Sequence, residues 1–196
     1  MKKIILLSLF IYSFSFGQEI KKTKTIDLEP SMRIGIVIPI HFGTNMITKE
    51  FNNNIGFTSN FSFLQVYNFK LSLGFEYQKY NETNSSIGII SHINKYNYSV
   101  QTDYTININQ KYSIIPFMQY GSSNLNFKNI NTIIAKQNGN EIKIGSYLDY
   151  KLNTTYSIYA SFNFCKLFND INASRKNEIY YASSNAFQIA VGLELN

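Results

Sequence analysis

The 196-residue sequence contains no tryptophan, one cysteine, three prolines and few charged residues. The single Cys165 excludes a disulfide scaffold, and the low glycine and proline content with no heptad pattern excludes collagen-like and coiled-coil chains. Charged residues make up 15% of the sequence, whereas about a quarter is usual for a soluble globular chain. The 16 phenylalanines and 15 tyrosines exclude a disordered chain and favour strands. Part of the surface is therefore expected to face something other than water.

The first residues have the pattern of a secretory signal peptide. Lys2 and Lys3 precede an apolar run, and Ser15 and Gly17 place small residues before a predicted cleavage ahead of Gln18. The run is too short to span about 30 Å of hydrocarbon as a helix. We therefore predict a signal peptide at 1–17, followed by a polar periplasmic tail at 18–32. The unpaired Cys165 of an exported chain is then expected to be a small buried side chain.

From Arg33 onward, apolar residues recur at every second position, as in strands with one apolar face. That face carries an apolar residue at 37 of 41 positions, whereas the opposite face is mostly Gly, Ser, Thr, Asn and Gln. The pattern predicts eight strands, at 33–42, 54–64, 69–78, 96–107, 112–120, 141–150, 156–165 and 186–195.

The links between these strands alternate strictly between long and short, with lengths of 11, 4, 17, 4, 20, 5 and 20 residues. In an up-and-down antiparallel sheet, this alternation places every short link at one end and every long link at the other. Asn68, Asn109 and Asn153 supply turn-forming side chains in the short links. This arrangement is typical of a transmembrane β-barrel with short periplasmic turns and long external loops. The long links are predicted at 43–53, 79–95, 121–140 and 166–185.

Two closed barrels share this strand pattern. A soluble lipocalin-like carrier would turn the apolar face inward around a small hydrophobic ligand, and a membrane barrel would turn it outward to lipid. The predicted polar face carries few charges for a soluble exterior, and the Gly-x-Trp start common in lipocalins is absent. Aromatic residues lie on the apolar face near both strand ends, as membrane interfaces favour. They are Phe69, Tyr112, Tyr150 and Tyr156 near the short links, and Phe42, Tyr77, Tyr96, Tyr120, Phe164 and Phe187 near the long ones.

The signal ending in Ser15-Phe16-Gly17, followed by eight strands with alternating links over 33–195, resembles the small OmpA/OmpX-type outer-membrane β-barrels of Gram-negative bacteria. The resemblance implies export to the outer membrane, contact with its lipid and lipopolysaccharide, and insertion by the outer-membrane assembly machinery. Members commonly end in an aromatic residue that this machinery recognises. This sequence departs from that pattern by ending in Leu195 and Asn196, with Phe187 as the nearest aromatic residue.

Charged residues on the polar face are expected to form an interior network, because isolated charges inside a barrel are costly. Glu141 is expected nearer the long-loop end. The interpretation weighed first is a stabilising polar plug, and the alternative is a narrow gated pore in which a lysine exchanges carboxylate partners. The candidate network is Lys70, Glu76, Asp103, Lys143, Asp149 and Glu194.

Candidate chemistry is scarce. Some barrels of this size modify lipopolysaccharide with a histidine that acts as general base for a serine nucleophile. Here His41 is predicted to point inward, and no His-x-Ser pattern follows it. His92 follows Ser91 in a long loop, and residues adjacent in sequence are not expected to form a hydrogen-bonded nucleophile and base. Two distant histidines and one cysteine predict no metal site. The lysines form no basic stripe for nucleic acid. No catalytic or cofactor-binding residue is predicted, and a lipopolysaccharide-modifying enzyme stays the remotest alternative.

The sequence therefore predicts 33–196 as a non-enzymatic outer-membrane barrel whose long external loops make structural or adhesive contacts, because loops are the variable part of such a scaffold. An external ligand or surface is the expected partner. A weaker hypothesis is attraction to lipopolysaccharide phosphate through Lys128, Lys136, Arg175 and Lys176.

Overall fold

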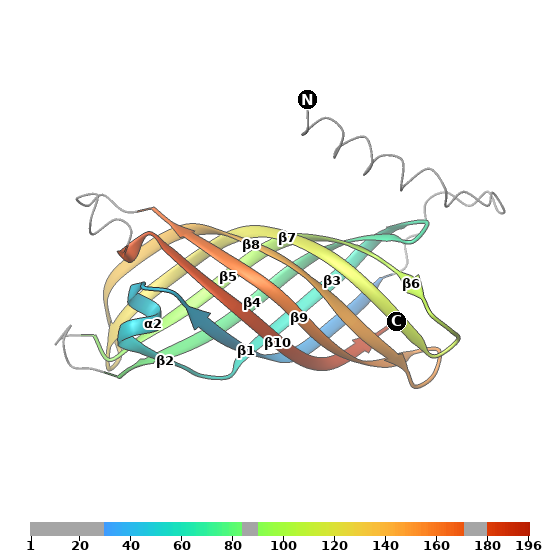
Figure 1. Ribbon diagram of the computed structural model, residues 1–196, viewed down its shortest axis with the longest axis horizontal. Helices are drawn as coiled ribbons and strands as arrows, with labels where there is room; N and C mark the ends of the chain where they lie inside the picture. The colour runs from blue at the N-terminus through green and yellow to red at the C-terminus, as the bar shows by residue number, and fades with distance from the viewer. Residues whose placement is uncertain (1–29, 84–89, 171–179) are drawn as a thin grey trace, which may run out of the picture.

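The computed structural model describes residues 30–83, 90–170 and 180–196. The predicted signal peptide and residues 18–29 of the predicted tail lie outside the described residues. Long antiparallel strands form one closed barrel (Figure 1). The long strands are β1 (Ser31–Phe42), β3 (Gly56–Val66), β4 (Phe69–Glu82), β5 (His92–Tyr104), β7 (Tyr112–Asn129), β8 (Thr132–Lys151), β9 (Tyr156–Asn169) and β10 (Ser183–Leu195).

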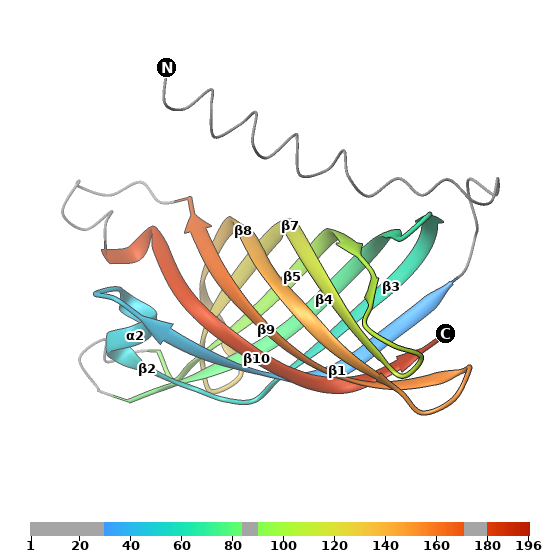
Figure 2. The ribbon, with the colours of Figure 1, turned by 45° about the vertical axis from the view of Figure 1, so that its right-hand side comes forward.

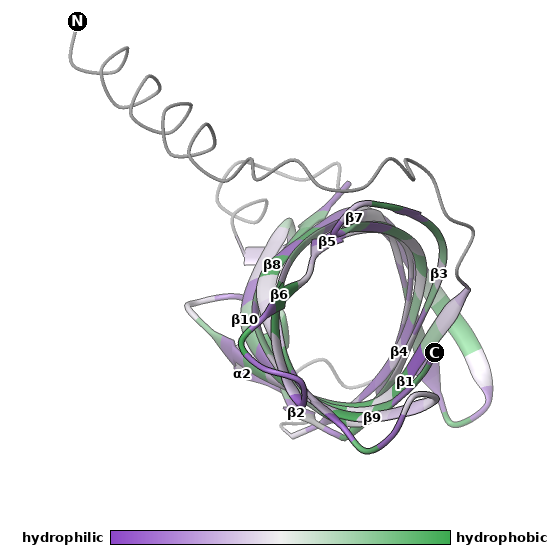
Figure 3. Ribbon diagram, turned by 90° about the vertical axis from the view of Figure 1, so that its right-hand side faces the viewer, coloured by the Kyte–Doolittle hydropathy of each residue, from purple (hydrophilic) through white to green (hydrophobic). Residues whose placement is uncertain are grey.

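Each long strand pairs with the long strands next to it in sequence, and the pairing of the first strand with the last closes the barrel. β1 pairs with β10 along its length, from Met32 opposite Leu195 to Phe42 opposite Asn185. β4 pairs with β5 over thirteen residue pairs, which joins the two halves of the sheet. Figure 3 looks along the barrel from the short-turn end and shows the ring. Closure matters because an unpaired strand edge inside a bilayer would leave backbone polar groups without partners.

Two short strands extend the ring. β2 (Phe51–Asn53) pairs with the outer end of β4, and β6 (Ile106–Asn107) pairs with β7 just after β5 ends. In the turn after β6, the side-chain oxygen Oδ1 of Asn109 accepts hydrogen bonds from the backbone N–H groups of Lys111 and Tyr112 at 2.8 and 2.9 Å. Asn153 does the same in the turn between β8 and β9. These side chains provide the turn chemistry predicted from the sequence.

The apolar face of the strands points outward. Ile36, Ile38 and Ile40 of β1 are 48%, 46% and 50% exposed, whereas Val37 between them is 1% exposed. The same alternation follows β7, β9 and β10. A lipocalin-like carrier needs the opposite arrangement, so this outward face contradicts the carrier alternative.

The aromatic residues form pairs at both ends of the outward face. Phe69 and Tyr104 have ring centroids 4.7 Å apart, and Tyr112 and Tyr150 have centroids 5.0 Å apart, at the short-turn end. At the other end, contacts join Phe42 to Phe187, Phe164 to Phe187, and Tyr77 to Tyr96. These two bands enclose the apolar surface, as predicted.

The predicted long link at 121–140 is wrong. β7 continues to Asn129 and β8 begins at Thr132, so this segment is a long hairpin with a turn of two residues. Register runs from Tyr112 opposite Tyr150 to Asn129 opposite Thr132, with a bulge near Phe127. Other strands also extend past the predicted limits at the long-link end, where polar residues replace the outward apolar ones.

The first long link folds onto the barrel mouth as helix α2 (Met46–Glu50) (Figure 2). Asn45 caps the helix, because its side-chain oxygen accepts a hydrogen bond from the Thr48 N–H at 3.0 Å. Met46 and Ile47 are 4% and 2% exposed, so the helix turns its apolar side inward. Among the described residues, no helix is long and apolar enough to cross a membrane.

Inside the ring, the Tyr159 side chain fills space left by a glycine. Gly35 faces Gly192 across the β1–β10 pair. A Cβ atom added at Gly35 would collide with the Tyr159 hydroxyl group and lie 2.6 Å from the Val191 carbonyl oxygen. Tyr159 is 1% exposed and has little room to retreat.

We expect Gly35→Ala to lower the free energy of unfolding by about 1–3 kcal/mol, the usual effect of overpacking a filled core. Urea titration of the protein folded in lipid vesicles would measure the change. The matched variant Gly35→Ala/Tyr159→Phe removes the hydroxyl group and should recover part of the loss. Equal stabilities of Gly35→Ala and the native protein would contradict this packing.

Candidate functional site in the barrel lumen

The charged residues inside the barrel form two groups at different depths. The lower group, nearer the short turns, is centred on Arg33 of β1. Its guanidinium nitrogens lie 3.2 Å from Asp103, 3.5 Å from Asp149 and 3.1 Å from Glu194. Lys70 of β4 adds a contact of 3.4 Å to Glu194. Three carboxylates therefore share two cations.

The upper group lies nearer the long-link end. Lys143 Nζ of β8 is 2.5 Å from a Glu76 oxygen and 3.1 Å from Glu141 Oε1. Lys95 of β5 forms an ion pair with Glu141 and lies 3.7 Å from Glu76. Here two cations balance two carboxylates. All four side chains are at most 4% exposed, so the opposite charges of the group, and not water, solvate each of these charges.

All six residues predicted from the sequence point into the lumen, but they do not form a single network. Glu76 and Lys143 meet in the upper group, and Lys70, Asp103, Asp149 and Glu194 meet in the lower group. The prediction omitted Arg33 and Lys95, two of the four cations that form interior ion pairs among the described residues. Both have the inward parity of their strands, Arg33 at the first position of the predicted strand 33–42 and Lys95 one residue before the predicted strand 96–107. Applying the same alternation of inward and outward side chains to the strand ends identifies both residues as inward.

An aromatic layer separates the two charged groups. Tyr147 lies at its centre, with Arg33 over its ring at 4.5 Å and Phe117 and Tyr159 in contact at 4.6 and 5.4 Å between centroids. The Tyr147 hydroxyl group donates a hydrogen bond to Gln101 at 3.1 Å. Val37, Ile115 and Ala190 pack with these rings. The middle of the lumen is therefore filled by side chains.

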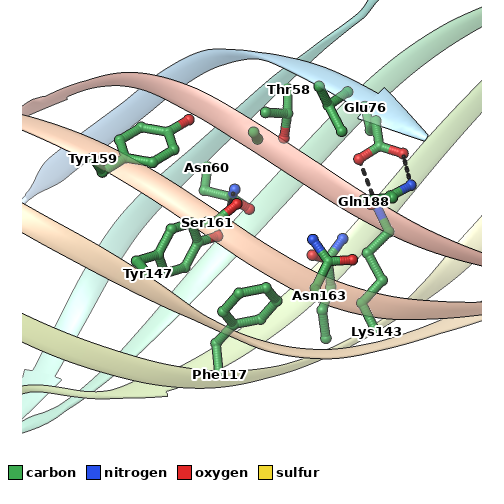
Figure 4. A pocket seen from close by; sticks show the side chains of 13 residues that line it. Thr58, Asn60, Glu76, Phe117, Lys143, Tyr147, Tyr159, Ser161, Asn163 and Gln188 are labelled. Carbon is green, nitrogen blue, oxygen red and sulfur yellow. Dashed lines mark hydrogen bonds and ion pairs between the residues drawn. The ribbon is translucent and has the colours of Figure 1, made fainter. Parts of the chain in front are cut away.

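A small cavity lies between this aromatic layer and the upper charged group (Figure 4). Its volume of about 20 Å³ gives room for about one water molecule. Glu76 borders it and accepts hydrogen bonds from Lys143 and from Gln188, as the dashed lines in Figure 4 mark. Asn60 Oδ1 and Asn163 Oδ1 are buried in its lining, and neither has a hydrogen-bond donor in the part of the chain that the structure describes. The cavity can therefore hydrate these groups, but it gives no passage for solutes.

The outer end of the lumen is closed by apolar side chains. Met46, Ile47 and Phe51 of the first long link pack against inward residues at the strand ends, each at most 7% exposed. The Tyr180 hydroxyl group donates to Glu50 Oε1 at 2.9 Å and so joins the fourth long link to helix α2. Burial and the nearby carboxylate raise the pKa of Tyr180 to about 12, so the donor proton is retained at neutral pH. The strand residues of this cap are Tyr80, Ile93, Leu125, Phe127 and Leu167.

His41 lies below this cap and points inward as predicted. Its Nδ1 is 2.9 Å from Ser184 Oγ, and its Nε2 is 3.3 Å from the Tyr80 hydroxyl oxygen. This serine partner is not evident in the sequence, because Ser184 is 143 residues away on β10. Ser184 is 3% exposed, and among the described residues the two imidazole nitrogens contact hydroxyl groups. We therefore interpret the His41–Ser184 contact as an interior hydrogen bond.

The expectation that Ser91 and His92 do not pair is wrong. Ser91 Oγ lies 2.9 Å from His92 Nδ1. The same oxygen donates to the Lys128 carbonyl at 3.0 Å and accepts from the Ile130 N–H at 2.9 Å, which ties β5 to the tip of the β7–β8 hairpin. Desolvation, with nearby Lys79 and Lys128, lowers the pKa of His92 and favours the neutral ring. The serine has a structural role here.

Two other predicted features can be placed. Cys165 is 3% exposed, in agreement with the expected small buried side chain. Among residues 30–83, 90–170 and 180–196, no group of three His, Cys, Asp or Glu side chains could hold a metal ion. Arg175 and Lys176 lie outside the described residues, whereas Lys128 and Lys136 lie on the β7–β8 hairpin.

No protein-family model and no curated protein matches the chain. Solved structures do. Neisserial surface protein A is 6% identical, with a TM-score of 0.61 over 88% of this chain and 99% of that one. The chain has the fold of a small outer-membrane β-barrel. Ail of Yersinia pestis, the attachment invasion locus protein, is 13% identical with a TM-score of 0.47 over 88% and 99% of the two chains. OprG of Pseudomonas aeruginosa is 9% identical with a TM-score of 0.48 over 87% and 95%.

The comparison confirms the predicted fold class, an eight-stranded antiparallel transmembrane β-barrel. In an outer-membrane barrel of this kind, the outward apolar band faces lipid and the inward polar face forms the lumen. This lumen contains two charged groups, an aromatic layer and an apolar cap. Its side chains therefore fill most of the space between the two ends of the barrel.

We expect Arg33→Met to lower the free energy of unfolding by about 3–5 kcal/mol, because it removes the guanidinium that all three lower carboxyl groups contact and leaves Lys70 beside Glu194 alone. Urea titration in lipid vesicles measures the change. Lys136→Met, on the exposed part of the hairpin, is the matched control and should shift stability by less than about 0.5 kcal/mol. Similar losses for the two variants would show that Arg33 does not hold the lower group together.

Proposed function

We propose that this protein is a non-enzymatic barrel of the bacterial outer membrane that makes contacts through its external end. The observation that supports this proposal most directly is the β7–β8 hairpin, which extends beyond the outer aromatic band. Tyr120 belongs to that band, and β7 continues nine residues further, to Asn129. At about 3.3 Å per residue, this gives about 30 Å of additional strand. A hairpin of that length reaches well outside the lipid.

The tip of the hairpin exposes apolar side chains to water. Ile130, Ile133 and Ile134 are 74%, 42% and 45% exposed. Outside the hydrocarbon region, such a cluster has no lipid to cover it. Exposed apolar clusters on water-facing surfaces commonly mark sites of interaction.

The backbone at the tip also has an unusual conformation. Ile130 has a φ angle of +51°, in the left-handed region that β-branched residues rarely adopt. Glycine would fit this turn at lower cost, by about 1–2 kcal/mol. A strained and exposed isoleucine is readily explained if its side chain is used for contact.

The hairpin further offers an open strand edge. β9 pairs with β8 only from Gly139 to Lys151. Within the part of the chain that the structure describes, Thr132–Gln137 has β7 on one side and no strand on the other. An extended segment of a partner protein could add to such an edge through backbone hydrogen bonds, with isoleucines as side-chain anchors. This combination supports adhesion to a protein surface.

Nearby cations support a secondary contact with lipid. Lys128 is half-buried and Lys136 is exposed, both on the outer part of the hairpin. Their ammonium groups are suited to lipopolysaccharide phosphate, which would orient the hairpin at the membrane surface. As for any outer-membrane barrel, we expect insertion by the outer-membrane assembly machinery after signal cleavage near Gly17.

We expect Ile130→Gly with Ile133→Ser to reduce adhesion of expressing cells severalfold. The readout is the retention of a non-adherent Gram-negative strain, expressing each form, on immobilised extracellular-matrix proteins. Because glycine relieves the strained turn, Ile130→Gly alone should not reduce the free energy of unfolding. Loss of contact can therefore be separated from loss of fold.

Ile108→Ser is the matched control, since Ile108 is 57% exposed in a turn at the opposite end. Every form should be recovered in the outer-membrane fraction with a heat-dependent shift in gel mobility, as closed barrels give. Equal retention of the hairpin variant and the Ile108 control would contradict the contact role. Recovery in the soluble periplasm would contradict the membrane assignment.

The alternative function is a narrow gated pore, and the filled lumen argues against it. In planar lipid bilayers, we expect the purified protein to give no stepwise current, because the apolar cap, the aromatic layer and both charged groups block the path. A stepwise current that disappears in Lys143→Ala would favour the pore instead. The double variant Met46→Ala/Ile47→Ala serves as a control for leakage through the cap alone.

A further inference from the structure

The lumen has a second accessible end that the external contact role does not use. At the short turns it opens into a pocket of about 660 Å³, which we call the vestibule. That volume is typical of small-molecule sites. Lys70 lines the vestibule on its inner side, and Lys111 and Lys151 line its rim near the turns. Under the proposed function, this end faces the periplasm.

The two rim lysines lie opposite each other on neighbouring strands. The register of β7 with β8 places Tyr112 opposite Tyr150, and one residue nearer the turns it places Lys111 opposite Lys151. The Lys151 N–H group donates to the Lys111 carbonyl oxygen at 2.8 Å, which fixes this arrangement. The Cβ atoms of directly opposite residues are about 4.5–5.5 Å apart, and like charges in such a pair repel each other. The pair is therefore unfavourable unless an anion lies between the two ammonium groups.

No carboxylate of the described residues provides that anion. Lys111 and Lys151 are exposed, and no carboxylate oxygen in the described ranges, including that of Asn196 at the rim, lies within ion-pair distance of either ammonium group. The carboxyl groups of the floor belong to the lower group, where Asp149 and Glu194 are 3% exposed and contact Arg33. Asp149 lies two residues before Lys151 on β8, about 7 Å deeper along the strand. The rim thus offers two adjacent cations to a ligand.

The wall between rim and floor is polar. Ser113 Oγ donates a hydrogen bond to Asn107 Oδ1 at 2.8 Å, which orients the Asn107 amide and leaves its NH₂ group as a donor. On the inner side, the Lys70 ammonium group has long contacts of 3.4 Å to both Ser31 and Glu194, so a third N–H group is left to donate. Such a wall suits a ligand that carries hydroxyl groups.

We propose that the vestibule binds phosphate monoesters of small, hydroxyl-rich compounds, such as sugar phosphates. The phosphate lies between Lys111 and Lys151 and accepts hydrogen bonds from both ammonium groups, and the hydroxyl-bearing part extends inward along Asn107 and Ser113. A phosphate monoester carries a charge of about −1.5 to −2 at neutral pH, so it can neutralise both lysines, whereas a carboxylate neutralises one. Binding needs no opening of the lumen, because the aromatic layer lies beyond the floor. The proposal rests on the proposed function only for the compartment in which the compound is met.

Calorimetric titration of the full-length protein in dodecyl maltoside micelles, at constant ionic strength, tests the site with glucose 6-phosphate, glucuronate and glucose. The three probes share a sugar ring and carry two, one and no negative charges. Because each exposed ion pair changes an affinity by severalfold, we expect glucose 6-phosphate to bind about fivefold more tightly than glucuronate, and glucose not to bind measurably. Equal affinities for glucose 6-phosphate and glucuronate would overturn the proposal, as would the absence of binding at millimolar glucose 6-phosphate.

Two double variants with the same change in net charge locate the phosphate. Lys111→Ala/Lys151→Ala should weaken the binding of glucose 6-phosphate by at least about tenfold and remove its advantage over glucuronate. Lys49→Ala/Lys136→Ala removes two exposed lysines at the opposite end and should bind as the native protein does. Equal weakening by both variants would show only a general attraction of anions and would overturn the site. Because the three probes are compared on the native protein, the test stands if a variant fails to fold, and it is independent of cell adhesion.

A lipid headgroup is the other source of phosphate at this end of the barrel. Addition of phosphatidylglycerol to the micelles should leave the affinity for glucose 6-phosphate unchanged, because Lys111 and Lys151 line the lumen and not the lipid-facing surface. A severalfold loss of that affinity would identify the headgroup as the occupant and overturn the assignment to a soluble phosphate monoester.

Discussion

Every backbone N–H and C=O group of a strand inside a bilayer must be paired by another strand, and this constraint governs the rest of the barrel. The pairing of β1 with β10 and of β4 with β5 satisfies it by removing both sheet edges. Closure then fixes which side chains face lipid and which face the lumen. Beyond the outer aromatic band, water can pair with the backbone. Within residues 30–83, 90–170 and 180–196, helix α2 and the unpaired stretch of β8 both lie in this region.

The strands between the aromatic bands could be predicted because lipid imposes one polarity on every second side chain. Ile34 to Phe42 shows this pattern without interruption. Above the outer band the surroundings are reversed, with water outside and the apolar cap inside. On β7, Leu125 and Phe127 accordingly have the inward parity, whereas Tyr120 has the outward one. Because the period-two pattern changes face there, the segment 121–140 resembles a polar loop in sequence although it forms a hairpin.

The interior network could be predicted only in part, for a different reason. Parity shows that Asp103 and Glu194 point inward, but not which cation lies between them. Arg33 reaches both from a strand 70 residues from one and 161 from the other. Such contacts depend on how the strands tilt around the ring, and no local sequence pattern encodes that tilt. For the same reason, the contact between His41 and Ser184 followed only from the three-dimensional structure.

The filled lumen also explains how the two ends of one small barrel can carry different chemistry. The lower charged group lies near the short-turn end, whereas the hairpin at the other end exposes isoleucines and, within the described residues, a strand edge. Between them lie the aromatic layer, the upper charged group and the apolar cap, each built from several strands. Because the side chains of these layers fill the lumen, the two ends of the barrel are separated from each other. Each end is therefore free to vary as long as the ring and its interior charges are kept.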